Sequence, residues 1–293
     1  MHAMYPNDIL QRFIFEEYPI RGQIVRLNAT YQAVLKRHEY PEPIQVLLGE
    51  AMASAALLSA TIKFDGSLIL QAQGKGPINM LVVESTSNRH LRGLVHWSGD
   101  VESTQLDTMF GGGNLVITIN PAEGKERYQG IVELGGRGFS DAVESYFTRS
   151  EQLPTQLWLA ADGSEACGLL LQHMPGMDSD PDSWNRITTL GATITQRELL
   201  QLPAQEIVHR LFHEEDLRIF SPEPTSFRCS CSIESIEAVL RMLGYNEVKS
   251  ILRDEGKISV NCEFCNQHYE FDEVDTERLF AAAAPFHVPP TRH

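Results

Sequence analysis

Two close pairs of cysteines near the C-terminus are the residues whose spacing most directly predicts chemistry. Cys229-Ser-Cys231 is followed, after thirty residues, by Cys262-Glu-Phe-Cys265, so four of the chain's five cysteines fall within 37 residues. Four thiolates in two short chelating turns can surround one Zn²⁺ tetrahedrally, with Zn–S distances of about 2.3 Å. The spacing therefore predicts a zinc site with one Zn²⁺ per chain.

The spacing leaves two roles open for this site. A closed four-thiolate site often only holds a small module together, and structural zinc contributes about 10–16 kcal/mol of folding free energy. The first pair, however, is CxC, and thiols as close as Cys229 and Cys231 can form a disulfide once the metal has left. An oxidant that takes the sulfurs removes the metal ligands, so such a site can sense oxidants by its chemistry alone. A structural zinc module and a redox switch both remain as interpretations.

His268 and Cys167 lie outside the four-cysteine set but carry groups that can bind a metal. His268 follows Cys265 by three residues. Because four thiolates already complete a tetrahedron, we expect His268 to be a solvated surface residue rather than a ligand. Cys167 lies in a strand-like run, and we expect it to be buried and unreactive.

Charge and composition restrict the classes of function. The chain of 293 residues has a formal net charge of −15. An acidic surface is repelled by phosphate backbones and anionic membranes, so we expect neither a nucleic-acid partner nor a membrane partner. Residues 1–7 show no basic stretch before an apolar run, and the apolar stretch at 51–62 is too short to cross a bilayer. We therefore expect a cytoplasmic protein, in which clustered cysteines indicate metal or redox chemistry rather than structural disulfides.

Residues 1–177 carry the signals of one α+β domain. Short β-rich runs at hairpin spacing, separated by Gly, Pro or Asn, predict antiparallel sheets. The expected strands are 9–15, 23–27, 67–72, 80–84, 91–96, 115–119, 128–134, 157–161 and 167–172. Helices are expected at 29–38 with Asn28 as N-cap, at 43–62, and at 140–149 with Ser140 as N-cap. The fold class is thus α+β: a mixed N-terminal domain with antiparallel sheets, a helical linker and a small C-terminal zinc-binding module.

Residues 178–226 are expected to form the helical linker, because a breaker-rich acidic loop precedes them. Apolar residues recur at helical spacing through 184–220, and Gly191 and Pro203 divide the pattern into short helices. Such helices have little stability of their own and depend on packing against another surface. The candidate switch residues in this stripe are Trp184, Ile187, Leu190, Ile194, Leu199, Leu211 and Phe212.

Residues 227–280 contain the four cysteines and are expected to form the zinc-binding module. Helical spacing at 233–243, with Gly244 as C-cap, and at 248–253 predicts two helices between the cysteine pairs. Short strands are expected at 258–260 and 269–271, on either side of the second pair. The remaining residues, 281–293, contain three prolines and no pattern, which predicts a flexible tail.

The cysteine pattern and four further motifs resemble the redox-regulated 33 kDa chaperonin family, a family of bacterial heat-shock holdases. The motifs are Arg127–Gly130 (RYQG), Tyr146–Thr155 (YFTRSEQLPT), Gly168–Pro175 (GLLLQHMP) and Phe212–Glu215 (FHEE). The resemblance extends from about Ile9 to Phe280, and all four family cysteines are present at matching spacing.

The resemblance implies a chaperone that is switched by oxidation, and not an enzyme. The reduced family member binds zinc, is folded and is largely inactive. Oxidation forms disulfides within each close pair, here Cys229–Cys231 and Cys262–Cys265; zinc is released, the module unfolds and the linker loses order. Oxidised subunits form a homodimer that holds unfolding client proteins without ATP, protects them from oxidative and heat-induced aggregation, and later passes them to foldase chaperones.

The apolar stripe of the linker is compatible with this function. If the zinc module pins the linker, loss of zinc frees the stripe or the surface beneath it, and exposed apolar surface is a natural site for binding unfolded clients. A packed interdomain linker that never contacts clients is the alternative interpretation.

Two other functions also fit the cysteines. A thiol–disulfide oxidoreductase using Cys262 and Cys265 predicts an attacking thiol of low pKa and turnover of a disulfide substrate. Zinc-bound thiols and the lack of a βαβ pattern around the motif argue against it. A zinc-ribbon protein that binds nucleic acid predicts salt-dependent retention of DNA or RNA, and the acidic composition argues against that function.

Overall fold

The computed structural model describes residues 8–62, 65–122, 126–136, 138–176 and 180–281. The chain divides into two compact units, Met1–Arg228 and Cys229–His293. The predicted tail at 281–293 lies outside the described residues except for Ala281, which ends a helix. The predicted boundary between 177 and 178 also falls on residues that are not described.

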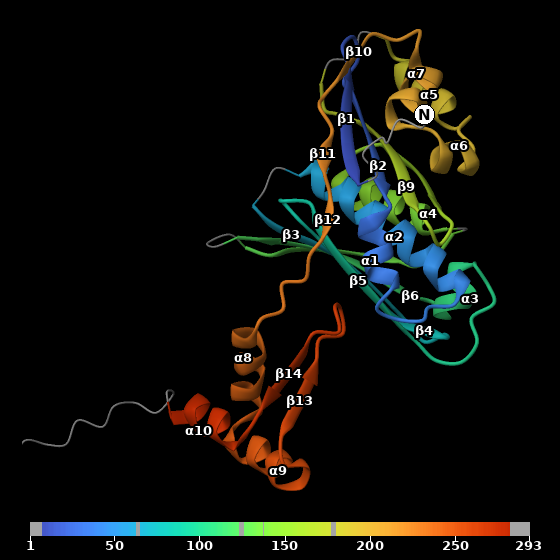
Figure 1. Ribbon diagram of the computed structural model, residues 1–293. Helices are drawn as coiled ribbons and strands as arrows, with labels where there is room; N and C mark the ends of the chain where they lie inside the picture. Colours follow the sequence, from blue (N-terminus) through green and yellow to red (C-terminus); the bar gives the residue numbers. More distant parts are fainter. Residues whose placement is uncertain (1–7, 63–64, 123–125, 137, 177–179, 282–293) are drawn as a thin grey trace, which may run out of the picture. The chain divides into compact units, whose positions relative to one another are not determined.

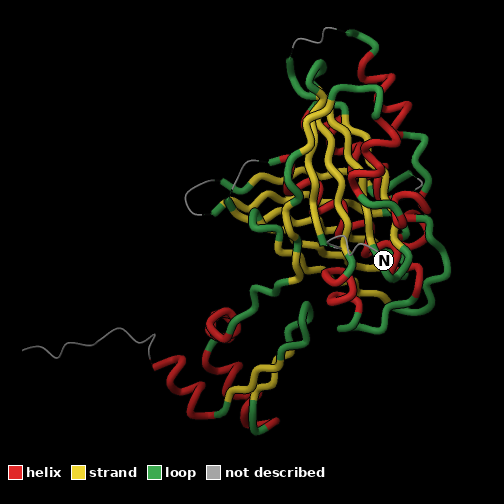
Figure 2. The backbone as a smooth tube through the Cα atoms, turned by 45° about the horizontal axis from the view of Figure 1, so that its top comes forward, coloured by secondary structure: helices red, strands yellow, loops and turns green. Residues whose placement is uncertain are grey.

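The first unit is built on two six-stranded sheets, named here sheet A and sheet B (Figures 1 and 2). Sheet A contains β1 (Ile9–Phe15), β2 (Ile20–Leu27), β8 (Thr155–Ala161), β9 (Ala166–His173), β10 (Leu217–Ile219) and β11 (Glu223–Pro224). Sheet B contains β3 (Gly66–Gly74), β4 (Ile78–Thr86), β5 (His90–Trp97), β6 (Gly113–Pro121), β7 (Tyr128–Glu133) and β12 (Ser226–Phe227). All nine predicted strands are present, with ends that differ by at most three residues.

The order of strands confirms the antiparallel sheets that hairpin spacing predicts. Sheet A runs β10-β1-β2-β9-β8, with β11 also paired to β1, and sheet B runs β12-β5-β4-β3-β6-β7. Among these neighbours only β12 and β5 are parallel. Strand β9 is buried along nearly its whole length, because both faces of sheet A are covered. Its sequence therefore reads as a continuous apolar run rather than an alternating one.

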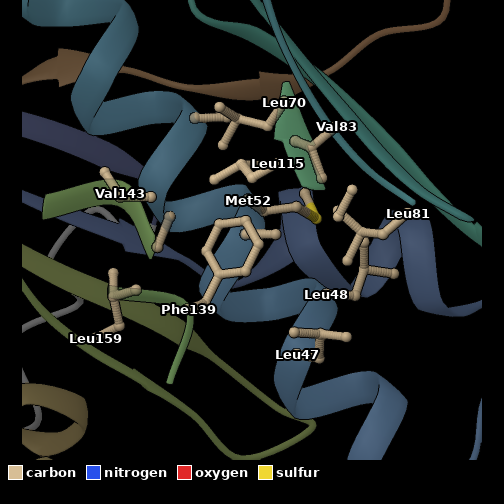
Figure 3. Packing of buried hydrophobic residues seen from close by; sticks show 14 of the residues in the cluster. Leu47, Leu48, Met52, Leu70, Leu81, Val83, Leu115, Phe139, Val143 and Leu159 are labelled. Carbon is tan, nitrogen blue, oxygen red and sulfur yellow. The ribbon is translucent and has the colours of Figure 1, made fainter. Parts of the chain in front are cut away.

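Helix α2 (Glu42–Thr61) contacts strands of both sheets and supplies the centre of the main core. Met52 lies among Leu70, Leu81 and Leu115 of sheet B (Figure 3). The helix is long and apolar enough to span a bilayer, but 72% of its most apolar window is buried inside the fold, as in the core helix of a soluble protein. This agrees with the buried helix expected at this apolar stretch. Gly49 is required here, because a Cβ atom would lie 2.6 Å from the Ala161 side chain.

Helix α1 (Ala29–Leu35) is capped by a residue that the sequence did not predict. Asn28 occupies the N-cap position, but its side chain makes no capping hydrogen bond. The Asp8 carboxylate instead accepts the backbone N–H groups of Asn28, Ala29 and Thr30 at 3.1, 3.0 and 2.8 Å. The predicted N-cap position of Asn28 is confirmed, but the capping hydrogen bonds come from Asp8, twenty residues away, which satisfies these donors.

The predicted helix at 140–149 begins earlier and changes form near its end. Helix α4 spans Phe139–Tyr146 with Gly138, not Ser140, at the N-cap, because Phe139 is fully buried in the main core. A π-turn, η1 (Phe147–Glu151), continues it. A further short helix, α3 (Leu106–Phe110), was not predicted.

Three short helices cover the face of sheet A that is opposite α2, named here its outer face (Figure 1). They are α5 (Ser183–Gly191), α6 (Gln196–Gln201) and α7 (Ala204–Phe212). The breaks fall where predicted, since α5 ends at Gly191 and Pro203 is the N-cap of α7. Helical signal was expected to continue to residue 220, and this was wrong: Leu217–Ile219 forms strand β10, because it pairs with the free edge of β1.

The second unit folds around its own small core. It consists of α8 (Ile233–Leu243), α9 (Tyr245–Glu255), β13 (Ile258–Asn261), β14 (His268–Phe271) and α10 (Glu273–Ala281). Helix α8 matches the prediction, α9 is longer than predicted, and α10 was missed. Its core residues are Leu240, Val248, Leu252, Ile258, Phe271 and Leu279.

Candidate metal centre

The first cysteine pair lies directly before α8. The Ser232 hydroxyl caps this helix by accepting the Ser235 N–H at 3.2 Å. Because Ser232 holds the extended conformation typical of an N-cap, the chain that precedes it leaves the helix axis. Cys229 and Cys231 are therefore held at a defined helix end rather than on its surface.

The second pair lies in the turn between β13 and β14. The N–H groups of Cys265 and Asn266 both donate to the Cys262 carbonyl, at 3.3 and 2.7 Å. Asn266 takes a left-handed conformation with φ of 58°, and the Cys262 N–H donates to the Gln267 carbonyl at 2.9 Å. These bonds close a tight knuckle that brings the two Sγ atoms together.

The four Sγ atoms form one cluster. All lie within 4.8 Å of one another, and two contacts join one pair to the other: Cys229 to Cys262 at 3.6 Å and Cys231 to Cys265 at 3.3 Å. A tetrahedron of sulfurs with Zn–S bonds of about 2.3 Å has S···S edges of about 3.8 Å. The S···S separations therefore fit a metal ion at the centre of the cluster. They do not select one disulfide pairing of the four cysteines over another.

Burial and hydrogen bonding set the protonation of the cysteines in the cluster. Burial raises the pKa of Cys262 above its ordinary value and that of Cys265 to about 12. The Tyr269 hydroxyl donates to Cys231 Sγ at 3.2 Å, and this bond raises the tyrosine pKa to about 12, so the hydroxyl stays a donor. Without a metal ion the cysteines are therefore neutral thiols. A divalent cation would stabilise their deprotonated, thiolate form. Tyr269 is a member of the site that cysteine spacing did not predict.

His268 lies on β14 and uses both ring nitrogens away from the sulfurs. Its Nδ1 contacts Asn261 Oδ1 at 2.6 Å, and its Nε2 contacts Glu270 Oε1 at 3.0 Å. The ring therefore bridges two polar residues of the hairpin. This placement agrees with the expectation that it is not a ligand.

Cys167 belongs to the first unit and lies on β9, beneath the helices of the outer face. It is 1% exposed, and burial raises its pKa to about 12. Its polar neighbour is Arg26, whose guanidinium donates to Cys167 Sγ at 3.6 Å and to the Leu200 carbonyl at 2.8 Å, and pairs with Glu165 at 3.2 Å. Arg26 thereby ties the end of α6 to β2. Composition could not reveal this contact, because it joins residues 174 positions apart.

The structure places the seven apolar residues of the predicted stripe in one cluster on the outer face of sheet A. Ile187, Leu199, Leu211 and Phe212 are buried, and Trp184, Leu190 and Ile194 are partly buried. Their counterparts on the sheet are Phe13, Phe15, Ile20, Ile24, Leu169 and Leu171. The stripe therefore covers a continuous apolar surface.

The first unit is an α+β unit of two sheets with an apolar face covered by short helices. The second is a small unit whose four clustered cysteines could hold a metal ion. Together they define the class of protein: a two-unit α+β protein with a C-terminal cysteine cluster. Comparison with known proteins narrows the class: the family described as "Hsp33 protein" matches residues 8–272. The chain belongs to this family, whose members are heat-shock chaperones that act in the stress response.

Individual relatives agree over nearly the whole length. The chain is 51% identical to the 33 kDa chaperonin of Nitrosococcus oceani over 290 residues, covering 99% of this chain and 100% of that protein. It is 47% identical to the 33 kDa chaperonin of Methylobacillus flagellatus, covering 94% and 96%. The crystal structure of a 33 kDa chaperonin from Thermotoga maritima has the same fold, with a TM-score of 0.81 at 22% identity, covering 94% of this chain and 98% of that one.

Proposed function

We propose that this protein is a redox-regulated, ATP-independent holdase chaperone and not an enzyme. It binds unfolding proteins after oxidation of its four-cysteine site and limits their aggregation under oxidative and heat stress. The observation that carries the proposal is the apolar outer face of sheet A, which only short helices cover. The chain continues from these helices to four clustered thiols.

In the reduced state Cys229, Cys231, Cys262 and Cys265 hold one Zn²⁺. The support is the spacing of the four Sγ atoms, which all lie within 4.8 Å of one another. When bound, zinc keeps the four sulfurs as thiolates and contributes folding free energy to a unit whose own core is small. Tyr269 orients Cys231 through its hydrogen bond.

Oxidation forms the disulfides Cys229–Cys231 and Cys262–Cys265. With a peroxide as oxidant, one sulfur attacks a peroxide oxygen and becomes a sulfenic acid as water leaves. The second thiol of the pair then attacks that sulfur, the S–S bond forms and a second water leaves. Two thiols lose two electrons and two protons, and one peroxide becomes two waters. Disulfide sulfurs are poor metal ligands, so the unit loses most of its stability.

Loss of this module frees residues 178–226, which act as the linker between residues 1–177 and the zinc module at 227–280, with 281–293 as a flexible tail. Each linker helix is too short to be stable alone. Release uncovers the apolar outer face and the stripe that matched it, and such surface binds unfolded clients. The oxidised chain acts as a homodimer in the cytoplasm and passes clients to foldase chaperones. Its acidic charge supports the absence of nucleic-acid and membrane partners.

The test begins with purified, reduced protein. Bound zinc is counted, the protein is treated with hypochlorite or with peroxide at elevated temperature, and zinc release is followed beside aggregation of a heat-denatured client. Stoichiometric zinc loss with the onset of holding supports the proposal. Zinc loss without holding under either treatment contradicts it and leaves a structural zinc module. Cys167→Ser is the matched control, since it removes the remaining cysteine without touching the cluster.

No feature of the described residues favours the oxidoreductase. An attacking cysteine of such an enzyme has a lowered pKa, whereas burial raises the pKa of Cys262 and Cys265. Catalytic turnover in an insulin-reduction assay would be the observation that restores it.

A further inference from the structure

Residues 217–227, named here the strap, lie along the edges of both sheets (Figure 1). Strand β10 pairs antiparallel with β1 through the register Phe13 to Ile219, and β11 pairs with β1 through Ile9 to Pro224. Strand β12 then pairs parallel with β5, with Phe227 opposite Leu91. One extended segment therefore completes sheet A and sheet B in turn.

Backbone groups make most of the strap's polar contacts. The N–H of Phe220 donates to the Arg12 carbonyl at 2.9 Å, and that of Thr225 donates to the Asp8 carbonyl at 3.0 Å. The side chain of Gln11 is 2% exposed and donates to the Phe220 carbonyl at 3.1 Å. Every one of these partners on the strap is a peptide group, so the edge recognises extended backbone and not a particular sequence.

Apolar side chains anchor the strap near its two ends, and charged side chains add ion pairs along it, including one from Arg218 to Glu16. Leu217 packs on the apolar cluster of the outer face, and Phe227 packs on the main core with the Arg37 guanidinium 4.0 Å from its ring centroid. Between them Ile219 and Phe220 are exposed. The Glu223 carboxylate adds ion pairs to Arg12 at 2.6 Å and to Arg89. A segment with so little buried apolar area belongs to the low-stability part of a fold.

The strap's position in the chain connects it to the proposed switch. It follows α7 of the linker helices, and only Arg228 separates Phe227 from Cys229. If oxidation removes the order of both flanking segments, the strap loses the attachments at its two ends. The strap is then held to β1 and β5 only by backbone hydrogen bonds, and water can replace these bonds. Partially exposed hydrogen bonds of this kind open readily.

We propose that the edges of β1 and β5 are a client-binding site, which an extended segment of an unfolding polypeptide occupies by strand addition when the strap leaves. This rests on the proposed holdase function and specifies how the client is bound. An unpaired strand edge is a template for another chain. The Gln11 amide, which donates to the Phe220 carbonyl of the strap, can donate in the same way to a carbonyl of any extended client. The apolar positions of Leu217 and Phe227 accept apolar client side chains.

The experiment uses the full-length protein and a synthetic peptide of the strap, Asp216–Arg228, carrying a fluorophore. Holding of a heat-denatured client by oxidised protein is measured first. Peptide binding is then followed by fluorescence anisotropy with reduced and oxidised protein, and the peptide is added to the holding assay. The matched control is the same peptide N-methylated at Phe220 and Thr225, which keeps every side chain and removes two donors.

The expected result is that the unmodified peptide binds oxidised protein only and suppresses client holding in proportion to its occupancy. The N-methylated peptide should bind about tenfold more weakly or worse, because two backbone hydrogen bonds are lost. Client holding with no peptide binding, or equal binding of both peptides, overturns the inference and leaves the holdase function intact. Conversion of dimer to monomer by the peptide, with holding unchanged, also overturns it and assigns the edges to a second copy. Absence of holding before peptide is added contradicts the proposed function itself.

Discussion

Phe212 of α7 packs edge-to-face on Phe15 of β1, with ring centroids 5.3 Å apart and an interplanar angle of 79°. The same ring lies 5.9 Å from that of Phe13. These three rings join the last linker helix to the sheet whose outer face it covers. Since α7 is only nine residues long, its order depends on contacts of this kind.

Truncation of this contact should loosen the linker without touching the cysteines. We expect Phe212→Ala to destabilise the attachment of α7 by about 3 kcal/mol or more, because a fully buried aromatic side chain is removed. Hydrogen exchange of residues 204–212 should become faster while bound zinc is unchanged, and holding should appear at lower oxidant doses. Tyr128→Ala is the control, since that ring is 42% exposed on sheet B. Unchanged exchange in the linker would contradict the role given to Phe212.

Arg26 is expected to hold helix α6 of the linker on sheet A through its hydrogen bond and ion pair. Arg26→Met keeps the length of the side chain but loses the 2.8 Å bond to the Leu200 carbonyl and leaves Glu165 without its ion pair. Both losses should weaken the packing of α6 on β9, so Cys167 should be alkylated faster in reduced protein. Alkylation is measured at Cys167 by peptide mass spectrometry.

Arg197→Met is the matched control, because Arg197 is an exposed residue of α6 whose guanidinium donates to Gln201 of the same helix. We expect this variant to protect Cys167 as the wild-type protein does. Equal alkylation rates in all three proteins would show that Arg26 does not hold the helix.

The hydroxyl of Tyr269 should strengthen metal binding. Tyr269→Phe removes the 3.2 Å hydrogen bond to Cys231 Sγ, and loss of a partner that orients a metal ligand lowers metal affinity by about 10-fold or more. Zinc affinity is measured by competition with a chromophoric chelator. Tyr245→Phe, which loses a hydrogen bond to Glu277 in the same unit, should retain wild-type affinity. Equal affinities in both variants would remove Tyr269 from the site.

Glu50 on α2 should make the stability of the first unit depend on pH. Burial raises the pKa of Glu50 from 4.5 to about 7. A carboxyl group with a raised folded-state pKa binds its proton more tightly in the folded state, so stability is greatest at low pH and falls as pH rises from about 4.5 to 7. This difference between the folded-state pKa and the ordinary pKa of Glu50 corresponds to a change of at most about 3 kcal/mol in the free energy of unfolding.

Glu50→Gln should therefore stabilise the first unit at pH 8 and leave it nearly unchanged at pH 4.5. Urea unfolding of both proteins at the two pH values measures the difference. Glu42→Gln, at the exposed start of the same helix, is the control and should show no pH-dependent change. A Glu50→Gln effect of the same size at both pH values would contradict the role of ionisation.

Most strand positions, the short linker helices and the two close cysteine pairs were predictable because each depends on local pattern. Alternating or continuous apolar runs place a strand whatever its partner, and Gly191 and Pro203 end helices through their own backbone preferences. The two chelating pairs, Cys229 with Cys231 and Cys262 with Cys265, are close in sequence, so each is close in space in any fold. The prediction that the two pairs meet came from the metal that they would share, and the four Sγ atoms lie within 4.8 Å of one another.

Contacts between distant residues were decided by the tertiary structure. The Asp8 carboxylate supplies the capping hydrogen bonds of α1, and Arg26 donates to the Leu200 carbonyl, because the fold brings these distant groups together. Residues 217–219 read as part of a helical region, yet they form a strand, since the unpaired edge of β1 offers hydrogen bonds that no sequence window contains. Composition thus determined what the chain carries, namely an apolar stripe and four thiols. The edges and faces that these segments cover follow only from the folded arrangement, because burial and backbone pairing depend on residues that the sequence keeps far apart.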